Sequence, residues 1–268
     1  MRSTKMHKQH RKLILAGKYL VSLACVLIIL MPISILVYGS LQGGGISNYI
    51  SILTKYHIET YFRNSLIVCV MSVVVIVVLD ILAGFACSKL QFRFKNALYM
   101  FLLSALLLPA ASILVPIFQL TSKMGLINSY LSLLGPYVVL IAPFNLLTIK
   151  NGFDAASDNV LESAIIDGCS TWQAMWRIAV PMNRAAIVMA VIWTFLSCWN
   201  EYLFAFVMLR SDEMMTITVL PTKFQSMYGG KMGMLYAALF IVLIPGMAIY
   251  AVLQKFIVAG LNTGAVKE

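Results

Sequence analysis

Charged residues are scarce in this sequence, and their scarcity excludes a soluble globular protein. Asp, Glu, Lys and Arg make up only 11% of the 268 residues, whereas a soluble domain carries about 25%. Hydrophobic residues reach 61%, and the mean hydropathy is +0.89. We therefore expect a membrane protein, for which the lipid bilayer is the main solvent. The net charge of +10 then reflects membrane topology rather than nucleic-acid binding.

Residues suited to redox, metal or nucleotide chemistry are also few or wrongly spaced. The five cysteines show no C-x-x-C spacing and most lie in apolar segments, so they are small buried hydrophobes rather than disulfides or metal ligands. The three histidines are scattered among polar residues, which argues against a metal site. The glycine run at 43–45 lacks the Gly-Lys-Ser/Thr ending of a phosphate-binding loop. We therefore expect no cofactor in this chain and no ATP hydrolysis by it.

Six apolar segments are long enough to cross a membrane, which takes about 20 residues of α-helix. The first is too long for a signal peptide, and no small-residue cleavage site follows it. A Gly- and Ser-bearing loop is expected at 42–60. Prolines in the third, fourth and sixth segments predict kinks, either around a pathway or satisfied by ordinary packing. We predict an all-α membrane protein with six transmembrane helices, at about Tyr19–Leu41, Ser65–Cys87, Ala97–Leu120, Tyr130–Ile149, Ala185–Leu209 and Leu235–Phe256.

The basic residues are distributed unequally between the two sides that six spans define. Residues 1–18, 88–96, 150–184 and the C-terminal tail carry 14 of the 20 Lys and Arg residues, and the other side carries 6. Because loops rich in Lys and Arg stay in the cytoplasm, both termini are predicted to be cytoplasmic. The polar segment between the fourth and fifth spans is then cytoplasmic as well.

That polar segment, Leu161–Met182, interrupts an otherwise apolar sequence. Asn159 and Glu162 have the spacing of a helix start, in which the glutamate reaches back to open backbone N–H groups. A short helix is expected to run to Asp167, and Gly168 supplies the permissive backbone that ends it. We therefore expect a helix, a glycine turn and a second short helix before the fifth span.

The second helix is expected to begin with a capping box formed by Ser170 and Gln173, and Pro181 breaks its pattern. Its aromatic face has i, i+3, i+4 and i+7 spacing and carries Trp172, Met175, Trp176 and Ala179. This face either packs against a partner or contacts only the chain's own helices. A further alternative is that the whole segment lies flat on the lipid surface as an amphipathic helix.

The residues Glu162-Ser163-Ala164-x-x-Asp167-Gly168, with Pro181 further on, resemble the EAA loop of binding-protein-dependent ABC importer permeases. Ser163 stands where the family has alanine, which is a small-for-small exchange. In that family the loop lies in the cytoplasm, and its short helix sits in a cleft of the ATPase subunit. The resemblance implies coupling to the ATPase through Glu162, Ser163, Ala164, Asp167, Gly168, Trp172, Met175 and Trp176.

Three further stretches resemble motifs of carbohydrate importer permeases, in the expected order. They are Arg63-Asn64-Ser65-Leu66, Trp199-Asn200-Glu201-Tyr202, and a C-terminal signature at 254–261 and 264–267. The chain is similar from about Tyr61 onward to the smaller permease of maltose and multiple-sugar importers. The resemblance implies a type I ABC importer permease fold, with a basic cytoplasmic tail at 1–18, a first transmembrane helix at 19–41, a permease core at 60–256 and a cytoplasmic tail at 257–268.

The resemblance also implies the partners of this chain in a bacterial cell membrane. They are a second homologous permease, two ABC ATPase subunits that hold ATP and Mg, an extracytoplasmic sugar-binding protein and the sugar itself. ATP binding would close the ATPases, drag the helix at 170–178 and rock the spans from inward- to outward-facing. The alternatives are the same fold carrying polyamine, phosphate or glycerol phosphate, a secondary transporter, and a membrane-embedded enzyme.

Two acids lie within the predicted spans, where an ionised side chain costs about 2.5–3.5 kcal/mol on insertion scales. Asp80 is either a pathway or gate residue or a buried polar contact to a neighbouring helix. Asn200 and Glu201 either line the pore or join helices by hydrogen bonds. The two acids lie in different spans, and no histidine lies in any span, which argues against an intramembrane enzyme.

Overall fold

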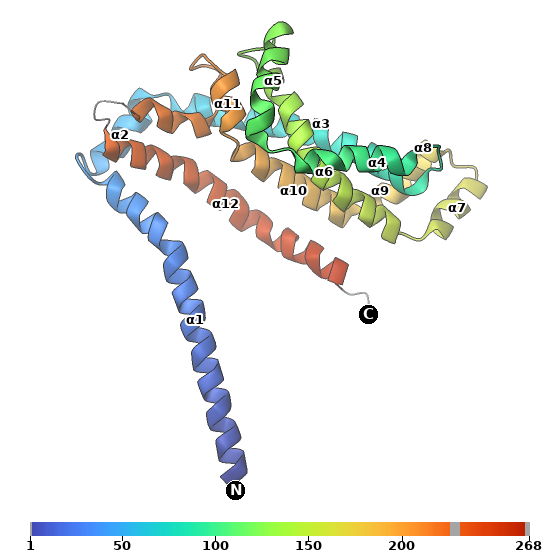
Figure 1. Ribbon diagram of the computed structural model, residues 1–268, viewed down its shortest axis with the longest axis horizontal. Coiled ribbons are helices and arrows are strands. Elements are labelled where there is room, and N and C mark those ends of the chain that lie inside the picture. Colours follow the sequence, from blue (N-terminus) through green and yellow to red (C-terminus); the bar gives the residue numbers. More distant parts are fainter. Residues whose placement is uncertain (1, 226–230, 266–268) are drawn as a thin grey trace. The chain divides into compact units, whose positions relative to one another are not determined.

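A computed structural model describes the backbone of residues 2–225 and 231–265 and the side chains of residues 15, 17–225, 231–252 and 254. Within these residues every regular element is helical (Figure 1). The elements are α1 (Arg2–Ser40), α2 (Ile46–Lys55), α3 (Ile58–Lys89), α4 (Lys95–Ser104), η1 (Ala105–Leu107), α5 (Ala110–Lys123), α6 (Leu131–Ala155), α7 (Asp158–Ile166), α8 (Thr171–Ala174), the π-helical turn η2 (Met175–Ala179), α9 (Val180–Met182), α10 (Arg184–Trp199), α11 (Leu203–Met208), η3 (Ile217–Phe224) and α12 (Met232–Ala265).

The predicted all-α membrane architecture is confirmed. In the described part of the chain, four helices are long and apolar enough to cross a membrane, and two bent helix pairs raise that number to as many as six. The four are Gly17–Ser40, Ile58–Lys89, Leu131–Ala155 and Met232–Val252. The pairs are Lys95–Leu107 with Ala110–Lys123, bent by 105°, and Thr171–Met182 with Arg184–Trp199, bent by 80°.

Two of the predicted spans are broken rather than continuous. The third breaks at Leu108, because the residue before a proline is driven out of the helical region; Leu108 has φ −83° and ψ 115°. Pro109 then starts α5 as its N-cap. The fifth was predicted to run to Leu209, but α10 ends at Trp199 and a separate short helix, α11, follows.

The chain divides into two compact units, Met1–Tyr56 with Pro221–Ile241, and His57–Leu220 with Val242–Glu268. In the larger unit α3, α6 and α10 pack against one another, and α4 packs on α6. In the smaller unit, residues 46–55 of the predicted loop form a helix instead, α2. The loop prediction was wrong there because the glycine run ends at Gly45 and an apolar pattern begins directly after it.

The two predicted tails continue the terminal helices. Residues 2–18 form the first part of α1, although the basic side chains up to Lys12 lie outside the described residues. α12 extends to Ala265, beyond the expected end of the sixth span at Phe256. Residues 266–268 of the predicted C-terminal tail, and the side chains of most of its signature motif, lie outside the described residues.

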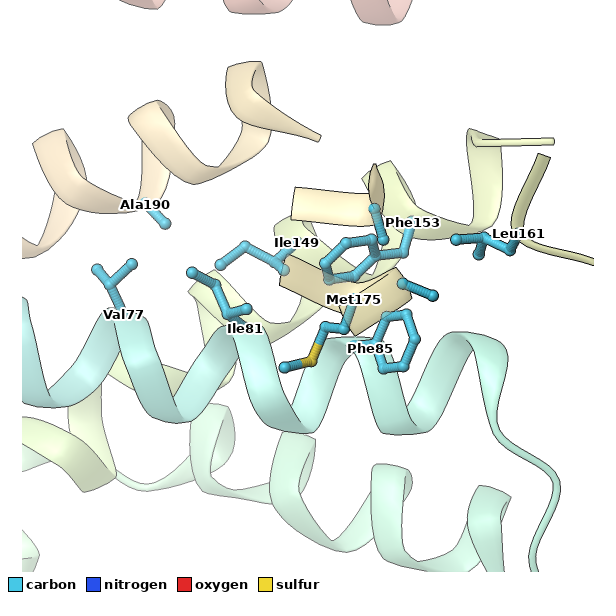
Figure 2. Close-up of a cluster of buried hydrophobic side chains, with 10 residues drawn as sticks. Val77, Ile81, Phe85, Ile149, Phe153, Leu161, Met175 and Ala190 are labelled. Atoms are coloured by element: carbon cyan, nitrogen blue, oxygen red, sulfur yellow. The ribbon is translucent and has the colours of Figure 1, made fainter. Parts of the chain in front are cut away.

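A cluster of buried apolar side chains holds the segment after α6 against the spans (Figure 2). It joins α3, α6, α7, α8, η2 and α10 through Val77, Ile81, Phe85, Ile149, Phe153, Leu161, Ala174, Met175, Ala179 and Ala190. The rings of Phe85 and Phe153 meet edge to face, with centroids 5.7 Å apart. Burying one large apolar side chain stabilises a fold by about 1.5–3 kcal/mol, so the cluster fixes this polar segment firmly to the bundle.

Candidate functional site

The segment of residues 156–183, between α6 and α10, is called the loop segment below. It contains α7, α8, η2 and α9. Figure 1 shows α7 and α8 at the end of the larger unit that lies opposite to α11. All eight residues predicted to couple to an ATPase lie in this segment.

The end of α7 has the predicted glycine turn. Gly168 has φ +91°, in the region that glycine adopts without strain. The Gly168 N–H donates to the carbonyl of Ile165 at 3.0 Å, and the Cys169 N–H donates to that of Ala164 at 2.9 Å. These two bonds are the Schellman arrangement, which satisfies the last carbonyls of the helix. The turn after α7 is therefore closed and well defined.

The start of α7 differs from the prediction. The N-cap is Ser157 rather than Asn159, and no side chain caps the helix. With this N-cap the third helical position is Val160, so Glu162 is too far along to reach the open N–H groups, and it is exposed instead. Asp158 in the first turn is favourably placed at the positive end of the helix dipole.

α8 begins with the predicted capping box. The Gln173 N–H donates to Ser170 Oγ at 3.3 Å, and the Ser170 N–H donates to Gln173 Oε1 at 3.0 Å. Both bonds satisfy backbone donors that the first turn of a helix leaves open. The prediction is confirmed by this geometry.

The predicted face of the second helix is partly buried in the chain's own core and partly exposed. Met175 and Ala179 are buried, at 3% and 1% exposure, but Trp172 is 61% exposed and Trp176 is only partly buried. The rings of Trp172 and Trp176 meet edge to face with centroids 5.8 Å apart, and the π-helical turn begins only at Met175. Met175 and Ala179 therefore pack in the chain's own core, and Trp172 faces outward.

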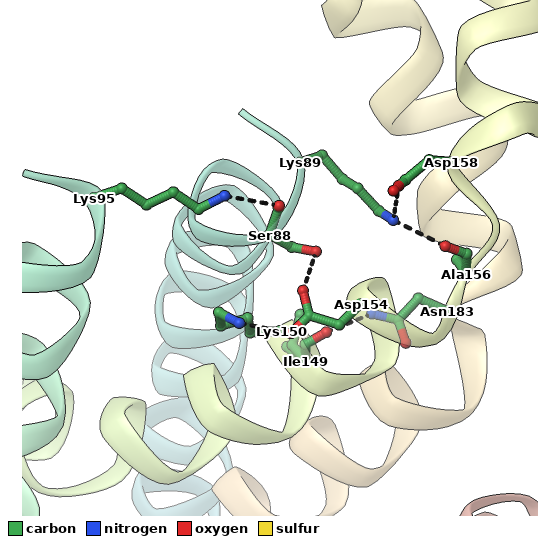
Figure 3. Close-up of polar contacts among 9 residues, drawn as sticks. All are labelled: Ser88, Lys89, Lys95, Ile149, Lys150, Asp154, Ala156, Asp158 and Asn183. Atoms are coloured by element: carbon green, nitrogen blue, oxygen red, sulfur yellow. Dashed lines mark hydrogen bonds and ion pairs between the residues drawn. The ribbon is translucent and has the colours of Figure 1, made fainter. Parts of the chain in front are cut away.

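Polar contacts that the sequence reasoning missed tie the loop segment and the end of α6 to α3 (Figure 3). Lys89, at the end of α3, donates from Nζ to the carboxylate of Asp158 and, at 2.9 Å, to the carbonyl of Ala156. Ser88 Oγ donates to Asp154 Oδ1 at 2.6 Å. Lys150 Nζ contacts Asp154 Oδ2, also at 2.6 Å. Together these contacts are called the α3 anchor.

A second connection joins α6 to the turn before α10. Asn183 is buried, and its Nδ2 donates to the carbonyl of Ile149 at 2.9 Å. Gly152 makes this approach possible, because a Cβ placed there would lie 1.9 Å from Asn183 Oδ1. Apart from Lys150–Asp154, which has i, i+4 spacing, no local pattern in the sequence predicts these contacts, since they join residues far apart in the chain. The acidic residues Asp154 and Asp158, which follow an apolar span, were the feature of the sequence that could have indicated polar contacts here.

The predicted coupling residues divide into exposed and buried groups. Ala164 and Met175 are buried and Trp176 is partly buried, whereas the exposed ones are Glu162, Ser163, Asp167, Gly168 and Trp172. The sequence reasoning also missed that Ile165 and Ile166 are exposed, at 52% and 84%. We call Glu162, Ile165, Ile166, Asp167 and Trp172 the α7 tip.

The Asn64-Ser65 motif lies near the opposite end of α3 and faces inward. Asn64 is fully buried, and its Nδ2 donates to the carbonyls of Glu213 at 2.8 Å and Met215 at 2.9 Å. Ser65 Oγ accepts from the Ile217 N–H at 2.8 Å. These bonds hold the chain between α11 and η3 against α3.

Glu201 accepts three hydrogen bonds within the chain. Its carboxylate accepts from the backbone N–H groups of Phe204 at 2.8 Å and Ala205 at 3.1 Å, and from the Tyr137 hydroxyl at 2.9 Å. The carboxylate thus satisfies open donors of the first turn of α11 and joins α11 to α6. Asn200 is exposed, and its Nδ2 donates to the carbonyl of Leu196 at 2.8 Å in its own helix.

Asp80 lies at an apolar cavity of about 540 Å³ between α3, α4, η1 and α6. The side chain is 3% exposed, and its Oδ2 has no hydrogen-bond partner among the described residues. Asn145 interacts with the carboxyl group, and Asn145 Nδ2 donates to Thr194 Oγ1 at 2.7 Å. Ser104 also lines the cavity.

Comparisons with known proteins agree with this architecture. Residues 80–262 match the family model described as binding-protein-dependent transport system inner membrane component. The permease protein YcjP of Escherichia coli is 30% identical over 207 residues, which cover 77% of this chain and 74% of that protein. The diacetylchitobiose uptake system permease DasC of Streptomyces coelicolor is 30% identical over 211 residues, covering 79% and 76%.

A solved structure shows the same fold. A chain of a bacterial ABC transporter involved in the import of the acidic polysaccharide alginate superposes with a TM-score of 0.78 at 21% identity, over 91% of this chain and 96% of that one. Members of this family are non-catalytic, multi-pass inner-membrane subunits without a cofactor, and their transport depends on a binding protein. The chain thus belongs to the inner membrane components of binding-protein-dependent transport systems, the permease subunits of ABC importers.

Proposed function

We propose that this chain forms one half of the membrane pathway of a carbohydrate importer and that the α7 tip binds an ATPase subunit in the cytoplasm. A second homologous permease and two ATPase subunits complete the assembly, and both chain termini lie in the cytoplasm. The unequal distribution of Lys and Arg supports that orientation. Membership of a binding-protein-dependent family excludes a self-sufficient secondary transporter and a membrane enzyme.

The observation that carries the docking proposal is the exposure of apolar side chains on a rigid helix. Ile166 is 84% exposed and Ile165 is 52% exposed, beside the acidic residues Glu162 and Asp167. Exposed apolar groups that cluster with polar neighbours mark interaction surfaces. A closed turn and a capping box hold this surface in one conformation, so little order is lost on binding.

The route from this surface into the spans is continuous. Leu161 of α7 and Met175 of η2 are members of the buried cluster that includes α3 and α10, and the α3 anchor adds a polar connection. In this proposal the helix at 170–178, expected to be dragged by the ATPase, moves together with α7. α7 presents the exposed surface, whereas η2 is part of the core that receives the force.

The test is ATPase activity of the reconstituted complex, stimulated by sugar-loaded binding protein. Glu162→Lys reverses a charge on the α7 tip, and Gly168→Pro disrupts the turn behind it. Both variants are expected to assemble and to lose stimulation. Glu213→Lys is the matched control, because it reverses an exposed acid near the opposite end of α3 and should leave stimulation unchanged. Unchanged stimulation in Glu162→Lys and Gly168→Pro would show that the loop segment is only a surface element.

Carbohydrate is the proposed substrate class because of the Trp199-Asn200-Glu201-Tyr202 motif and the C-terminal signature. Relatives named for diacetylchitobiose and arabinooligosaccharides support it. A polyamine, phosphate or glycerol phosphate remains the alternative within the fold. Uptake assays with each solute class decide between them, and stimulation by a polyamine but by no sugar would overturn the assignment.

Asp80 is our proposed pathway residue. Its unpaired Oδ2 is an acceptor at the edge of a cavity, and sugar hydroxyl groups are donors. For Glu201 and Asn200 the bonding pattern supports a structural role at the α10–α11 junction. Asp80→Leu is therefore expected to raise the sugar concentration for half-maximal uptake, with Asp80→Asn intermediate. If both variants change only thermal stability, Asp80 is a helix contact instead.

A further inference from the structure

α2 is an amphipathic helix with one uncovered apolar side. Ile46, Ile50 and Leu53 lie at i, i+4 and i+7, and so on one face, and are 71%, 56% and 56% exposed. Asn48 and Ile52, on the other side of the helix, are buried within the smaller unit. The exposed face is called the α2 apolar stripe.

Hydrogen bonds from the first turn of α2 fix this helix to the end of α1. Asn48 Nδ2 donates to the carbonyls of Ser40 at 2.9 Å and Gln42 at 3.1 Å, and the Tyr49 hydroxyl donates to Ser40 Oγ at 2.6 Å. Ser40 is the last residue of the apolar segment Gly17–Ser40 that can cross the membrane. α2 is therefore fastened to the point at which the chain leaves the hydrocarbon region.

The polar residues of α2 face a different environment. Ser47 and Ser51 lie beside Asn48 in the lining of a cavity of about 530 Å³, together with Gln42 and Lys231. Thr54, next to Leu53 at the end of the stripe, donates from Oγ1 to the carbonyl of Ile50 at 2.8 Å within the helix. The helix thus has three sides: a buried side, a polar side at this cavity and an exposed apolar side.

We propose that α2 lies in the membrane–water interface on the side to which Ser40 leads, with the α2 apolar stripe inserted among the lipid acyl chains near the headgroups. A helix with this division of faces is stable in that layer, because its apolar side leaves water while its polar side stays hydrated. Lys55, in the last turn, carries a cation that can reach lipid phosphate from the end of the helix.

Lipid is favoured over a protein partner by continuity with the span. The stripe begins six residues after Ser40, and side chains along the Gly17–Ser40 segment are themselves exposed in the chain. The surface that the bilayer covers on α1 therefore leads directly to α2. A docking protein would instead need to displace lipid at this edge.

The test uses fluorescent labels on the assembled transporter in vesicles of phosphatidylethanolamine and phosphatidylglycerol. Native cysteines are replaced by serine, and Ile50→Cys or Leu53→Cys is labelled with an environment-sensitive dye. Ser47→Cys is the matched control, because Ser47 is also exposed but lies on the polar side. Retained sugar-stimulated ATPase activity and an unchanged gel-filtration profile show that each variant is folded.

Labels at positions 50 and 53 are expected to emit at shorter wavelength and to be quenched several-fold more by lipids brominated near the headgroup than the label at position 47. Equal quenching at all three positions, or quenching only by aqueous iodide, would overturn the proposal. Protection of position 50 that appears only after loaded binding protein is added would also overturn it, and would identify the stripe as a protein docking surface.

Discussion

The two ends of α3 each contact a motif-bearing region of the chain, but the motif side chains at the two ends face in different directions. Near the end where α3 starts, Asn64 and Ser65 face inward and bond the chain around Glu213, Met215 and Ile217. At the other end, Lys89 holds the loop segment, in which Ala164 of the motif is buried but Glu162 and Asp167 are exposed. The role of a motif residue therefore cannot be assigned until the structure shows whether its side chain faces the interior or the surface.

The two ends of α3 thus distinguish residues that stabilise the fold from residues that can bind another subunit. Inward-facing polar groups are satisfied within the chain, and removing one leaves a buried partner unpaired. Outward-facing groups such as Glu162 and Ile166 contribute little to the fold and are free to bind another subunit. Variants can therefore be ranked by how far they lower the stability of the protein. The variants that lower stability least are expected to reduce coupling to the ATPase most specifically.

The largest loss of stability is expected for Met175→Ala. Met175 is 3% exposed in the cluster that joins the loop segment to α3, and truncating such a residue costs about 2–5 kcal/mol. The thermal midpoint of the purified complex in detergent should fall clearly. A midpoint like that of the unchanged protein would mean that η2 doesn't hold the loop segment to the spans.

A smaller loss is expected for Glu201→Ala, at the inward-facing end. The change leaves the Tyr137 hydroxyl and the open N–H groups of α11 without their acceptor, which costs about 1–3 kcal/mol. Glu201→Gln keeps one acceptor oxygen and should lose about half as much in the same thermal assay. If Glu201→Ala is as stable as the unchanged protein but transports poorly, the residue acts in the pathway.

Ser170→Ala should cost about 1 kcal/mol, because it removes an N-cap that accepts from the Gln173 N–H. Ser170→Asp keeps a capping oxygen and should restore most of the stability. Trypsin cleavage at Arg177 offers a local readout, since fraying of α8 exposes the backbone. Equal cleavage rates in the two variants would contradict the importance of the capping box.

Ile166→Ser should change stability least, by within about 0.5 kcal/mol, because the side chain is 84% exposed. The same variant should lose most of the stimulated ATPase activity if the α7 tip is the docking surface. Co-purification of the ATPase subunits and their stimulation by loaded binding protein are the two measurements. A normal value of both would place docking elsewhere on the loop segment.

Local chemistry could be predicted from the sequence, and long-range chemistry could not. The capping box at Ser170 and the turn at Gly168 depend on neighbours within a few residues, so their patterns were sufficient. The start of α7 was misplaced by two residues, because Asn159 also fits the N-cap preference. The π-helical turn at Met175–Ala179 was not predicted, because a single such turn leaves no repeating pattern in the sequence.

The same distinction explains the missed residues. Lys89 and Asp158 are 69 positions apart and meet only because α3 and α6 pack along their lengths. Ile165 and Ile166 occupy the unspecified positions of the motif, so the resemblance gave them no weight. Apolar residues in a short helix are ordinarily assigned to a core, and only the structure shows that these two face outward.

α3 is a single uninterrupted helix of 32 residues, and its sequence contains no proline. At 1.5 Å per residue it is a rod about 48 Å long, and tilting it by about 5° at one end displaces the other by about 4 Å. Lys89 clamps one end to the loop segment, and Asn64 grips the chain beyond α11 at the other. Under the proposed function, a push at the Lys89 end would reach the Asn64 end as a displacement of about the size of a side chain.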